Sequence, residues 1–404
     1  MKERLFIHGG KKTREKRFDY SAPIGDEEIA SVNKVLRKKS LSGFYKDFLG
    51  GEMVQKFEKD FAKYIGTRYA IVFNSGTSAL HAALAACNIG PGDEVIVPPF
   101  TFTATASSVL MVGAATVFAD IEPDTFCIDP KKIKAAITKK TKAIVPVHIY
   151  GKVCNMDEIL AIAKEDSLKV IEDACQSPGC KHEGRMVGSI GDAGVFSFVE
   201  TKNMVIGEGG MVTTNSDEIA DRCRLIRNHG EVWTKGRPRE YISNILGYNF
   251  RMTEIHAALG IEQLKKLDSL NEIRRKNVSY LQKELGRFSG LEVMRYKEGE
   301  ISHLYPILYN EREIGVAKDR FIELMESEGI TLSRGYPQPL YKTPIFKEKL
   351  KEAGFGGIKC RVAEDVCRRL ICITAMHYPY NIEDMKDIVS AVKKIFDNIG
   401  EIRP

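Results

Sequence analysis

Short apolar runs recur along the first half of the chain, and turn residues or helical stretches separate most of them. The runs cover residues 69–73, 94–97, 115–119, 142–147, 168–172, 193–198 and 211–213. Between some of them the apolar positions follow helical spacing, as at 79–87 and 103–112. Strands that are apolar on both faces and alternate with helices are typical of an α/β domain with a mainly parallel sheet. We therefore predict a mainly parallel, mixed sheet flanked by helices.

The segments on either side of this region have a different pattern. Residues 1–25 lack strong periodicity and are expected to form an arm, whereas 26–40 have the pattern of a helix with Asp26 as its N-cap. A second helix is predicted at 52–64, and a long helical region at 253–287 leads out of the α/β region. The remainder offers strand candidates at 304–309 and 370–374 and helix candidates at 316–328, 361–369 and 382–398. This pattern predicts three parts: an arm over 1–25, a large α/β domain over 26–265 and a small α+β domain over 266–404.

Composition narrows the function classes. The 404 residues are 43% hydrophobic and 28% charged, which is ordinary for a globular protein with a large core. The formal charge of +6 is spread along the chain, so we expect no nucleic-acid partner. No apolar run reaches the ~18 residues of a membrane span, and the charged start lacks the apolar middle of a secretion signal. Nine cysteines without a CxxC pair predict reduced, buried thiols in a cytoplasmic protein.

One lysine has an unusual sequence context. Lys202 follows an apolar run, lies five residues after Ser197, and is followed by the stretch Gly207-Glu208-Gly209-Gly210. A lysine at the end of a strand, beside a hydroxyl and a glycine-rich turn, is placed to form an imine with a carbonyl compound. Pyridoxal phosphate (PLP) is the carbonyl compound that protein lysines most often hold in this way. This cofactor also needs a carboxylate for its pyridine nitrogen, a phosphate cradle and a flat group against its ring.

Asp173 is the candidate carboxylate. It follows the hydrophobic strand candidate that ends in Val170-Ile171-Glu172, which places it at the carboxyl end of a predicted strand, where open α/β sheets bind ligands. A buried aspartate beside the pyridine nitrogen keeps that nitrogen protonated. The alternative is an aspartate that only caps a following helix.

The phosphate cradle and the flat group against the ring also have candidate residues at predicted strand ends. Ser75-Gly76-Thr77-Ser78 leads into a helix and can present backbone N–H groups to a phosphate, with the hydroxyls of Thr77 and Ser197 beside them. The same stretch is also an ordinary N-cap. Phe102 follows another strand and can stack on the ring, or else pack in the core. Gln176, one helical turn past Asp173, is placed to meet the phenolic oxygen of the cofactor.

Taken together, these segments resemble the DegT/StrS-type sugar aminotransferases, a branch of the fold-type I PLP enzymes. The resemblance covers roughly residues 22–260 in one order and weakens after about 290. The segments that carry it include FNSGTSALHAAL, GDEVIVPPFTFTATA, VIEDACQS, FSFVETKN, GEGGMVTT, RNHGE and GYNFRMTEIHAALG.

The resemblance implies a role for each matching residue. Lys202 is implied as the Schiff-base lysine and Asp173 as the partner of the pyridine nitrogen, and these two form the predicted catalytic pair. The implied contacts with the rest of the cofactor are Gln176 at the phenolic oxygen, Phe102 on the ring, and Gly76, Thr77 and Ser197 at the phosphate. Asn249 matches an asparagine that reaches the phosphate of the neighbouring subunit, which implies a homodimer with shared active sites. His229, Tyr336 and His377 are substrate candidates.

The implied activity is transfer of an amino group from glutamate or glutamine to a keto sugar, most simply a nucleotide-linked keto-deoxy sugar. The segments 334–341 and 376–380 match the nucleotide-sugar enzymes only loosely and are similar to the branch that handles free keto cyclitols. A PLP-dependent sugar dehydratase and a regulatory protein without turnover are the remaining alternatives. The dehydratase branch replaces the imine lysine with histidine, and Lys202 argues against it.

We assign no catalytic or metal-binding role to the other histidines or to the basic run near the N-terminus. His81, His148, His182, His256 and His303 lack metal-ligand spacing, so we expect core or paired histidines and no metal. The basic run 11–17 is expected to be a solvated arm, or else an entrance that attracts an anionic substrate.

Overall fold

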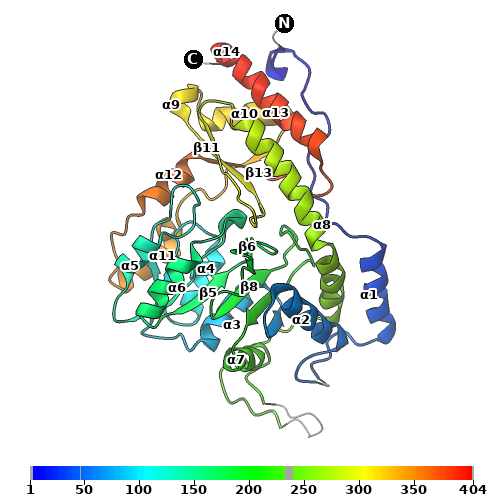
Figure 1. The fold of residues 1–404 in the computed structure, drawn as a ribbon, viewed down its shortest axis with the longest axis vertical. Helices are drawn as coiled ribbons and strands as arrows, with labels where there is room; N and C mark the ends of the chain where they lie inside the picture. Colours follow the sequence, from blue (N-terminus) through cyan, green and yellow to red (C-terminus); the bar gives the residue numbers. More distant parts are fainter. Residues whose placement is uncertain (1–2, 46, 233–239, 403–404) are drawn as a thin grey trace.

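The computed structural model describes residues 3–45, 47–232 and 240–402. Its two larger sheets are joined by a long helix (Figure 1), and a two-stranded hairpin forms a third sheet. The larger sheet has seven strands in the order β1-β9-β8-β5-β4-β2-β3. The strand bounds are β1 Tyr69–Phe73, β2 Glu94–Val97, β3 Ala115–Phe118, β4 Thr141–Ile144, β5 Lys169–Asp173, β8 Ala193–Ser197 and β9 Gly210–Thr214. β9 runs antiparallel to both of its neighbours, and the other pairings are parallel. The predicted mainly parallel, mixed sheet is confirmed.

Because five consecutive neighbours from β8 to β3 run in one direction, and β1 shares that direction, their carboxyl ends lie along one edge of the sheet. Each of these strands is buried along nearly its whole length, which is why its sequence is apolar on both faces. The predicted chemical groups at the strand ends are therefore brought to a common edge.

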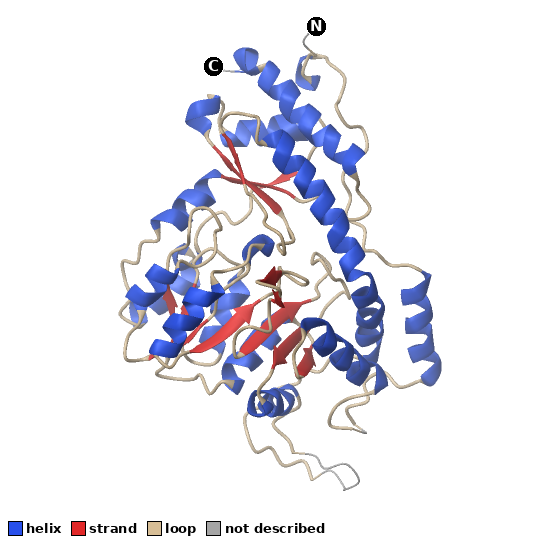
Figure 2. Ribbon diagram, viewed as in Figure 1, coloured by secondary structure: helices blue, strands red, loops and turns tan. Residues whose placement is uncertain are grey.

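Helices flank the large sheet on both sides (Figures 1 and 2). Helix α3 packs on β8 and β9 and contacts α4 and α7, whereas α1 and α2 pack against α8. The helix bounds in this part are α1 Asp26–Lys38, α2 Glu52–Ile65, α3 Gly76–Ala86, α4 Thr103–Met111, α5 Pro130–Ala136, α6 Met156–Glu165, α7 Asp217–Arg227 and α8 Glu254–Leu285. Short elements complete it: η1 Phe6–His8, η2 Ile149–Gly151, and the hairpin β6 Lys181–His182 and β7 Arg185–Met186.

The smaller sheet has the order β10-β11-β13-β12 and is antiparallel throughout. Its strands are β10 Leu291–Val293, β11 Tyr305–Tyr309, β12 Leu332–Ser333 and β13 Leu370–Ile373. The accompanying helices are α9 Glu311–Ile314, α10 Lys318–Ser327, η3 Leu340–Lys342, α11 Pro344–Glu352, α12 Arg361–Arg369, α13 Ile382–Asp397 and α14 Ile399–Ile402. Figure 1 shows α8 running from the large sheet to this sheet, with both termini at the far end. The predicted boundary between 265 and 266 falls inside α8, and the domain division stays a prediction.

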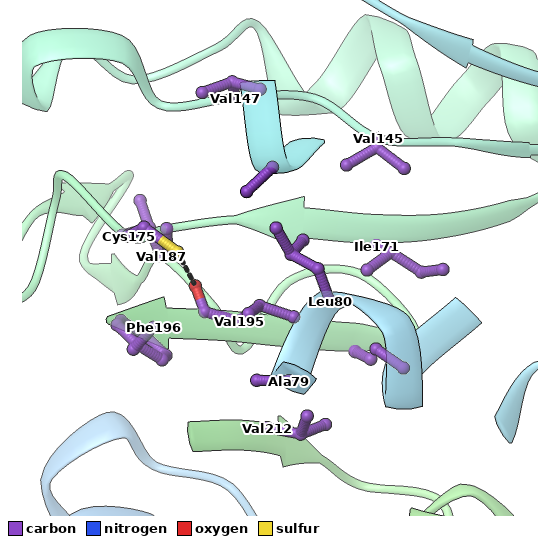
Figure 3. Packing of buried hydrophobic residues seen from close by; sticks show 14 of the residues in the cluster. Ala79, Leu80, Val145, Val147, Ile171, Cys175, Val187, Val195, Phe196 and Val212 are labelled. Carbon is purple, nitrogen blue, oxygen red and sulfur yellow. Dashed lines mark hydrogen bonds between the residues drawn. The ribbon is translucent and has the colours of Figure 1, made fainter. Parts of the chain in front are cut away.

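Two apolar clusters form the core. The first surrounds the large sheet, and Figure 3 shows Ala79 and Leu80 of α3 against Ile171, Val195 and Val212 of the strands. This cluster also includes Phe346, Leu350 and Cys367 from α11 and α12, so a segment of the C-terminal third packs on the large sheet. The second cluster lies between the small sheet, α10, α13 and the C-terminal half of α8. All nine cysteines are buried and unpaired, as predicted.

The structure corrects three local predictions. Asp26 is not the N-cap of α1, because Gly25 takes that position and its N–H donates to the Glu28 carboxylate at 2.8 Å. Helix α3 begins at Gly76 rather than at residue 79, so the predicted cradle is the first turn of the helix itself. The arm is also not simply solvated, since Arg14 pairs with Asp384 and Asp387 on α13.

Candidate active site

A cavity of about 470 Å³ opens at the carboxyl ends of β1, β5 and β8, beside the loop that follows β2. Seven of the eight predicted cofactor residues line it, together with one of the three substrate candidates. These are Gly76, Thr77, Phe102, Asp173, Gln176, Ser197, Lys202 and Tyr336. These residues belong to separate strand–turn segments of the sequence, and the parallel sheet brings the ends of those segments together.

Lys202 lies in the loop after β8, where its backbone N–H donates to Val199 O at 2.9 Å. Among the described residues, its side-chain amine has no hydrogen bond or ion pair. Burial lowers the pKa of Lys202, and the nearby Cys175 and Asp173 offset part of this effect. A lowered pKa leaves more of the amine neutral, which is the form that attacks a carbonyl carbon.

Asp173 is the last residue of β5 and is only 4% exposed. Its carboxylate accepts hydrogen bonds from the Thr105 hydroxyl at 2.7 Å and from the Cys175 N–H at 3.2 Å. No helix begins after Asp173, because residues 174–180 form turns. The alternative of a helix-capping aspartate is therefore wrong, and the prediction that Gln176 lies one helical turn further on is wrong for the same reason.

The strand end at Asp173 is held by a buried carboxylate behind it. Glu172 accepts three backbone N–H groups from Gly188, Ile190 and Gly191 at 2.7–2.8 Å, and it pairs with His148 at 3.1 Å. The other ring nitrogen of His148 accepts from Cys154 N, so Nε2 carries the proton and donates to Glu172. These bonds fix the β5 backbone and so fix the direction of Asp173.

The predicted phosphate cradle has open donors. Ser75 is the N-cap of α3, and its hydroxyl accepts from Ser78 N at 3.1 Å. Among the described residues, the N–H groups of Gly76 and Thr77 have no acceptor, and the hydroxyls of Thr77 and Ser197 have no partner. Free N–H groups in the first turn of a helix, with the positive end of its dipole, form an anion site.

Close backbone approach shapes this cradle. A Cβ on Gly76 would lie 2.8 Å from Ser197 Cβ, and one on Gly210 would lie 2.2 Å from Ser75 O. Glycine at both positions lets the α3 turn sit directly against the ends of β8 and β9. The glycine-rich stretch after Lys202 thus has a packing role in the cradle.

Aromatic groups form the remaining walls. Phe102 is the N-cap residue of α4 and is 56% exposed, so the alternative of a core phenylalanine is wrong. Tyr336 stacks on Tyr150 with an interplanar angle of 11°, and Phe100 meets Tyr336 edge-on at 5.3 Å. The Gln176 amide accepts from Tyr150 N at 2.9 Å and donates to the Tyr336 hydroxyl at 3.3 Å. One Gln176 N–H and the Tyr336 hydroxyl proton therefore stay available to a ligand.

Three predicted residues lie outside the cavity. Asn249 is exposed and pairs through its backbone with Asn228, so its side chain does not enter the cavity of its own chain. His229 does not line the cavity, and its N–H donates to Tyr248 O. His377 lies on the far side of Lys202, where it lines a much smaller cavity.

Sequence reasoning missed His303, which lines the main cavity. Asn271 Nδ2 donates to Pro178 O, so Asn271 Oδ1 accepts from Asn203 Nδ2, and Asn203 Oδ1 is left to accept from His303 Nδ1 at 3.3 Å. This relay leaves His303 Nε2 without a proton and able to accept a hydrogen bond. Burial, together with the nearby charges of Lys202 and Arg274, holds the pKa of His303 well below its usual value, so the ring stays neutral.

No local sequence signal marks His303, because its relay joins segments about 70 to 100 residues apart. The other four histidines of its group are core or paired residues, as predicted: His81 packs against Tyr248 and Phe250, and His148, His182 and His256 pair with Glu172, Asp157 and Thr253. No helix among the described residues has the length and apolar character that crossing a bilayer requires.

Comparison with known proteins decides the family. The model of the DegT/DnrJ/EryC1/StrS aminotransferase family matches residues 23–393. This chain belongs to that family. It is 38% identical to the spore coat polysaccharide biosynthesis protein SpsC of Bacillus subtilis over 93% of this chain and 96% of that protein. It is 41% identical to a GDP-perosamine synthase of Caulobacter vibrioides, over 73% of this chain and 79% of the synthase.

A cyclitol enzyme also matches over the full length. The L-glutamine:2-deoxy-scyllo-inosose aminotransferase of Streptoalloteichus tenebrarius is 33% identical, with 99% of each chain covered. Among solved structures, the aminotransferase PseC of Helicobacter pylori superposes with a TM-score of 0.85, 30% identity and coverage of 95% and 100%. NtdA of Bacillus subtilis, solved with the bound cofactor PMP, gives 0.82, 29% identity and coverage of 96% and 87%.

These matches confirm the predicted resemblance, the aminotransferase class and the PLP cofactor. The chain is therefore a PLP-dependent enzyme of a sugar aminotransferase family. The cavity fits that cofactor: it has a buried carboxylate and, within the described part of the chain, an amine and several N–H and hydroxyl groups that have no partner.

Proposed function

We propose that this protein transfers the amino group of glutamate or glutamine to a keto sugar, with a nucleotide-linked keto-deoxy sugar as the first candidate acceptor. The observation that supports it most is the shared cavity of Lys202 and Asp173. Beside them, the N–H groups of Gly76 and Thr77 have no acceptor among the described residues. An amine, a carboxylate and an anion site in one cavity meet the needs of PLP at its aldehyde, its ring nitrogen and its phosphate.

When bound, PLP supplies an electron sink for the carbon that loses its proton. In this proposal Lys202 would hold the cofactor at its aldehyde, and its side-chain amine would be the group that accepts and returns the α-proton of the donor. Asp173 holds the ring nitrogen protonated, while Thr105 and Cys175 N fix the direction of its carboxylate. Phe102 covers the ring, Gln176 meets the phenolic oxygen, and Gly76, Thr77 and Ser197 bind the phosphate.

The wall opposite the cradle suits a hydroxyl-rich acceptor. Tyr336 has a free hydroxyl proton, and His303 Nε2 has a free lone pair, so this wall offers one donor and one acceptor. Burial raises the pKa of Tyr336 well above its usual value, so the hydroxyl keeps its proton at working pH. A polyhydroxylated ketone can pair with both groups, whereas a simple keto acid leaves them unpaired.

We also propose a cytoplasmic homodimer in which Asn249 reaches the phosphate in the partner subunit. Support comes from the exposed position of Asn249 and from its absence from the cavity lining of its own chain. Mixing Lys202→Ala and Asn249→Ala subunits tests this, because a shared site predicts that each mixed dimer has one intact site and one site that carries both substitutions. Activity that never exceeds the sum of the two inactive variants would contradict it.

The direct experiment uses the purified protein loaded with its cofactor. Incubation with glutamate or glutamine should give the corresponding 2-oxo acid in an amount equal to the cofactor. The aminated form is then mixed with nucleotide-linked keto sugars and with free ketoses, including 2-deoxy-scyllo-inosose, and return of the original absorbance identifies the acceptor. The full-length match to the inosose enzyme favours including the cyclitol as the second candidate.

The same experiment separates the remaining alternatives. A dehydratase would consume the sugar without forming a 2-oxo acid from the donor. A regulatory protein without turnover would show no change of absorbance with either substrate. Formation of the 2-oxo acid followed by an aminated sugar is the outcome that the proposal requires.

A further inference from the structure

A buried guanidinium without a carboxylate partner lies behind the catalytic lysine. Arg274, on α8, is 5% exposed, and its Nη1 donates to the backbone carbonyl of His303 at 3.1 Å. Among the residues that the structure describes, Arg274 forms no ion pair. Burial without a counter-ion lowers its pKa to about 10. An unpaired buried charge is strongly destabilising, so such a residue points to an anion that arrives from outside.

Arg274 borders a small cavity of about 20 Å³ that Lys202 also borders. Lys202 therefore forms a wall between this cavity and the main one. The other lining groups are Tyr20, Ser21, Pro23, Asn203, Val205, Leu270, His377 and Tyr378, and none of them is acidic. The described lining thus carries no negative charge at neutral pH.

The titratable neighbours do not supply a counter-charge. Burial and the Arg274 cation lower the pKa of His377 to about 4, so that ring is neutral. Burial and the nearby Glu200 carboxylate raise the pKa of Tyr20 to about 12, and the Tyr20 hydroxyl donates to Glu200 O. Glu200 does not line this cavity and, among the described residues, forms no ion pair with Arg274. His303, whose carbonyl Arg274 contacts, is neutral as well.

We propose that Arg274 binds a carboxylate of the amino donor. This inference rests on the proposed transamination from glutamate or glutamine. A donor amine bound at the cofactor would occupy the position of the Lys202 Nζ, and in any amino acid the α-carboxylate carbon lies two bonds, or about 2.5 Å, from the amine nitrogen. The α-carboxylate therefore comes to rest beside the tip of Lys202, where the two cavities adjoin.

The volume of the small cavity limits how much of the donor can enter it. A volume of about 20 Å³ holds a single water-sized group, which matches one carboxylate oxygen. The second oxygen and the rest of the donor stay in the main cavity. Arg274 itself is only 5% exposed, so its charge pair with the carboxylate would be shielded from bulk water, and such a pair is strongest away from water.

The test compares Arg274→Met with Arg275→Met, its neighbour on α8, which is partly exposed and pairs with Glu272. Arg274→Met should raise the KM for glutamate and glutamine by roughly 10- to 100-fold, because a charged hydrogen bond is lost, while the step with the keto sugar stays within about twofold. Arg274→Lys should lie between wild type and Arg274→Met. Arg275→Met should leave all constants unchanged.

A binding measurement does not depend on turnover. Glutarate, which has two carboxylates and no amine, should raise the melting temperature of the wild-type holoenzyme, and its neutral diamide should not. The glutarate effect should vanish in Arg274→Met and persist in Arg275→Met. Without ligand, Arg274→Met should melt at or above the wild-type temperature, because it removes an unpaired charge.

The outcomes separate this inference from the proposed function. Wild-type transamination with an unchanged donor KM in Arg274→Met would overturn the role of Arg274 alone. A lower melting temperature of Arg274→Met together with an unchanged glutarate shift would assign Arg274 a structural role and also overturn the inference. Failure of wild type to form any 2-oxo acid overturns the proposed function, and an Arg274-dependent glutarate shift would then leave an anion site without the donor role.

Discussion

The two sides of the cavity are built in different ways. On the proposed cofactor side, Thr77, Asp173 and Ser197 stand at or just after the ends of strands. Among the described residues, the N–H groups of Gly76 and Thr77 and the hydroxyls of Thr77 and Ser197 have no hydrogen-bond partner. On the substrate side, His303 and Tyr336 come from the C-terminal third and are already hydrogen-bonded to Asn203 and Gln176. The first side is open and made from local turns. The second is a network assembled over long sequence distances, and it is there that we place the choice of substrate.

Lys202 joins the two sides, so its loss should have the largest effect. Lys202→Ala should lower transamination by at least about a thousandfold, because both the covalent hold on the cofactor and the proton transfer disappear. Circular dichroism and size-exclusion chromatography should match wild type, and the exposed Lys164→Ala serves as the control. Turnover near the wild-type rate in the Lys202→Ala variant would rule out the proposed mechanism.

Removing the charge of Asp173 tests whether the proposed cofactor side needs a negative group beside the ring. Asp173→Asn should lower the rate of the step with the amino donor by roughly a hundredfold, because a neutral amide does not hold the ring nitrogen protonated. Thr105→Val keeps the carboxylate and removes one hydrogen bond of 2.7 Å, so its loss should be about tenfold or less. Single-turnover absorbance measurements check both. Equal rates for Asp173→Asn and wild type would show that the carboxylate does not serve the ring.

The difference between the two sides also explains what the sequence could predict. Apolar runs bounded by turns located the large-sheet strands to within a few residues, and chemical groups at their ends located Lys202, Asp173 and the cradle, because a parallel sheet gathers such ends at one edge. The His303 relay and Arg274 had no such signal. Their meaning depends on which distant groups surround them, and those contacts exist only after α8 and the small sheet pack. The prediction of a helical turn after Asp173 was wrong for a local reason. The Asp173 side chain accepts a hydrogen bond from Cys175 N, and the backbone forms a turn there instead.

Substituting Gly76 tests the proposed cofactor side alone, because Gly76 belongs to the cradle and does not contact the substrate wall. A Cβ there would lie 2.8 Å from Ser197 Cβ, so Gly76→Ala should push the α3 turn away and weaken cofactor binding by about tenfold or more. Equilibrium titration of the apoprotein with PLP measures this. Ser197→Gly removes both the atoms that would clash and one proposed phosphate contact, so the double variant Gly76→Ala/Ser197→Gly should bind PLP about as well as Ser197→Gly alone. The donor and acceptor KM values at saturating PLP should stay near wild type in both.

The acidity of Lys202 predicts how stability depends on pH. Burial lowers its pKa in the folded apoprotein below the unfolded value, so below both values the protonated amine destabilises the fold. As pH rises from the folded toward the unfolded pKa, the unfolded chain binds more protons and this penalty is relieved. Lys202→Met should therefore raise the melting temperature of the apoprotein at pH 7, and the gain should shrink toward pH 10. A gain that grows with pH would contradict a lowered pKa.

Tyr336 should show the smallest effect, and it tests whether the substrate side acts independently of the cofactor side. Its hydroxyl accepts from Gln176 Nε2 at 3.3 Å and keeps its own proton for a ligand. Tyr336→Phe removes that donor but keeps the ring that stacks on Tyr150, so the acceptor KM should rise about fivefold, near 1 kcal/mol. PLP affinity and the donor KM should not change, and Tyr280→Phe on α8 is the matched control. A loss of PLP affinity in Tyr336→Phe would instead show that the two sides are coupled through Gln176, which faces both.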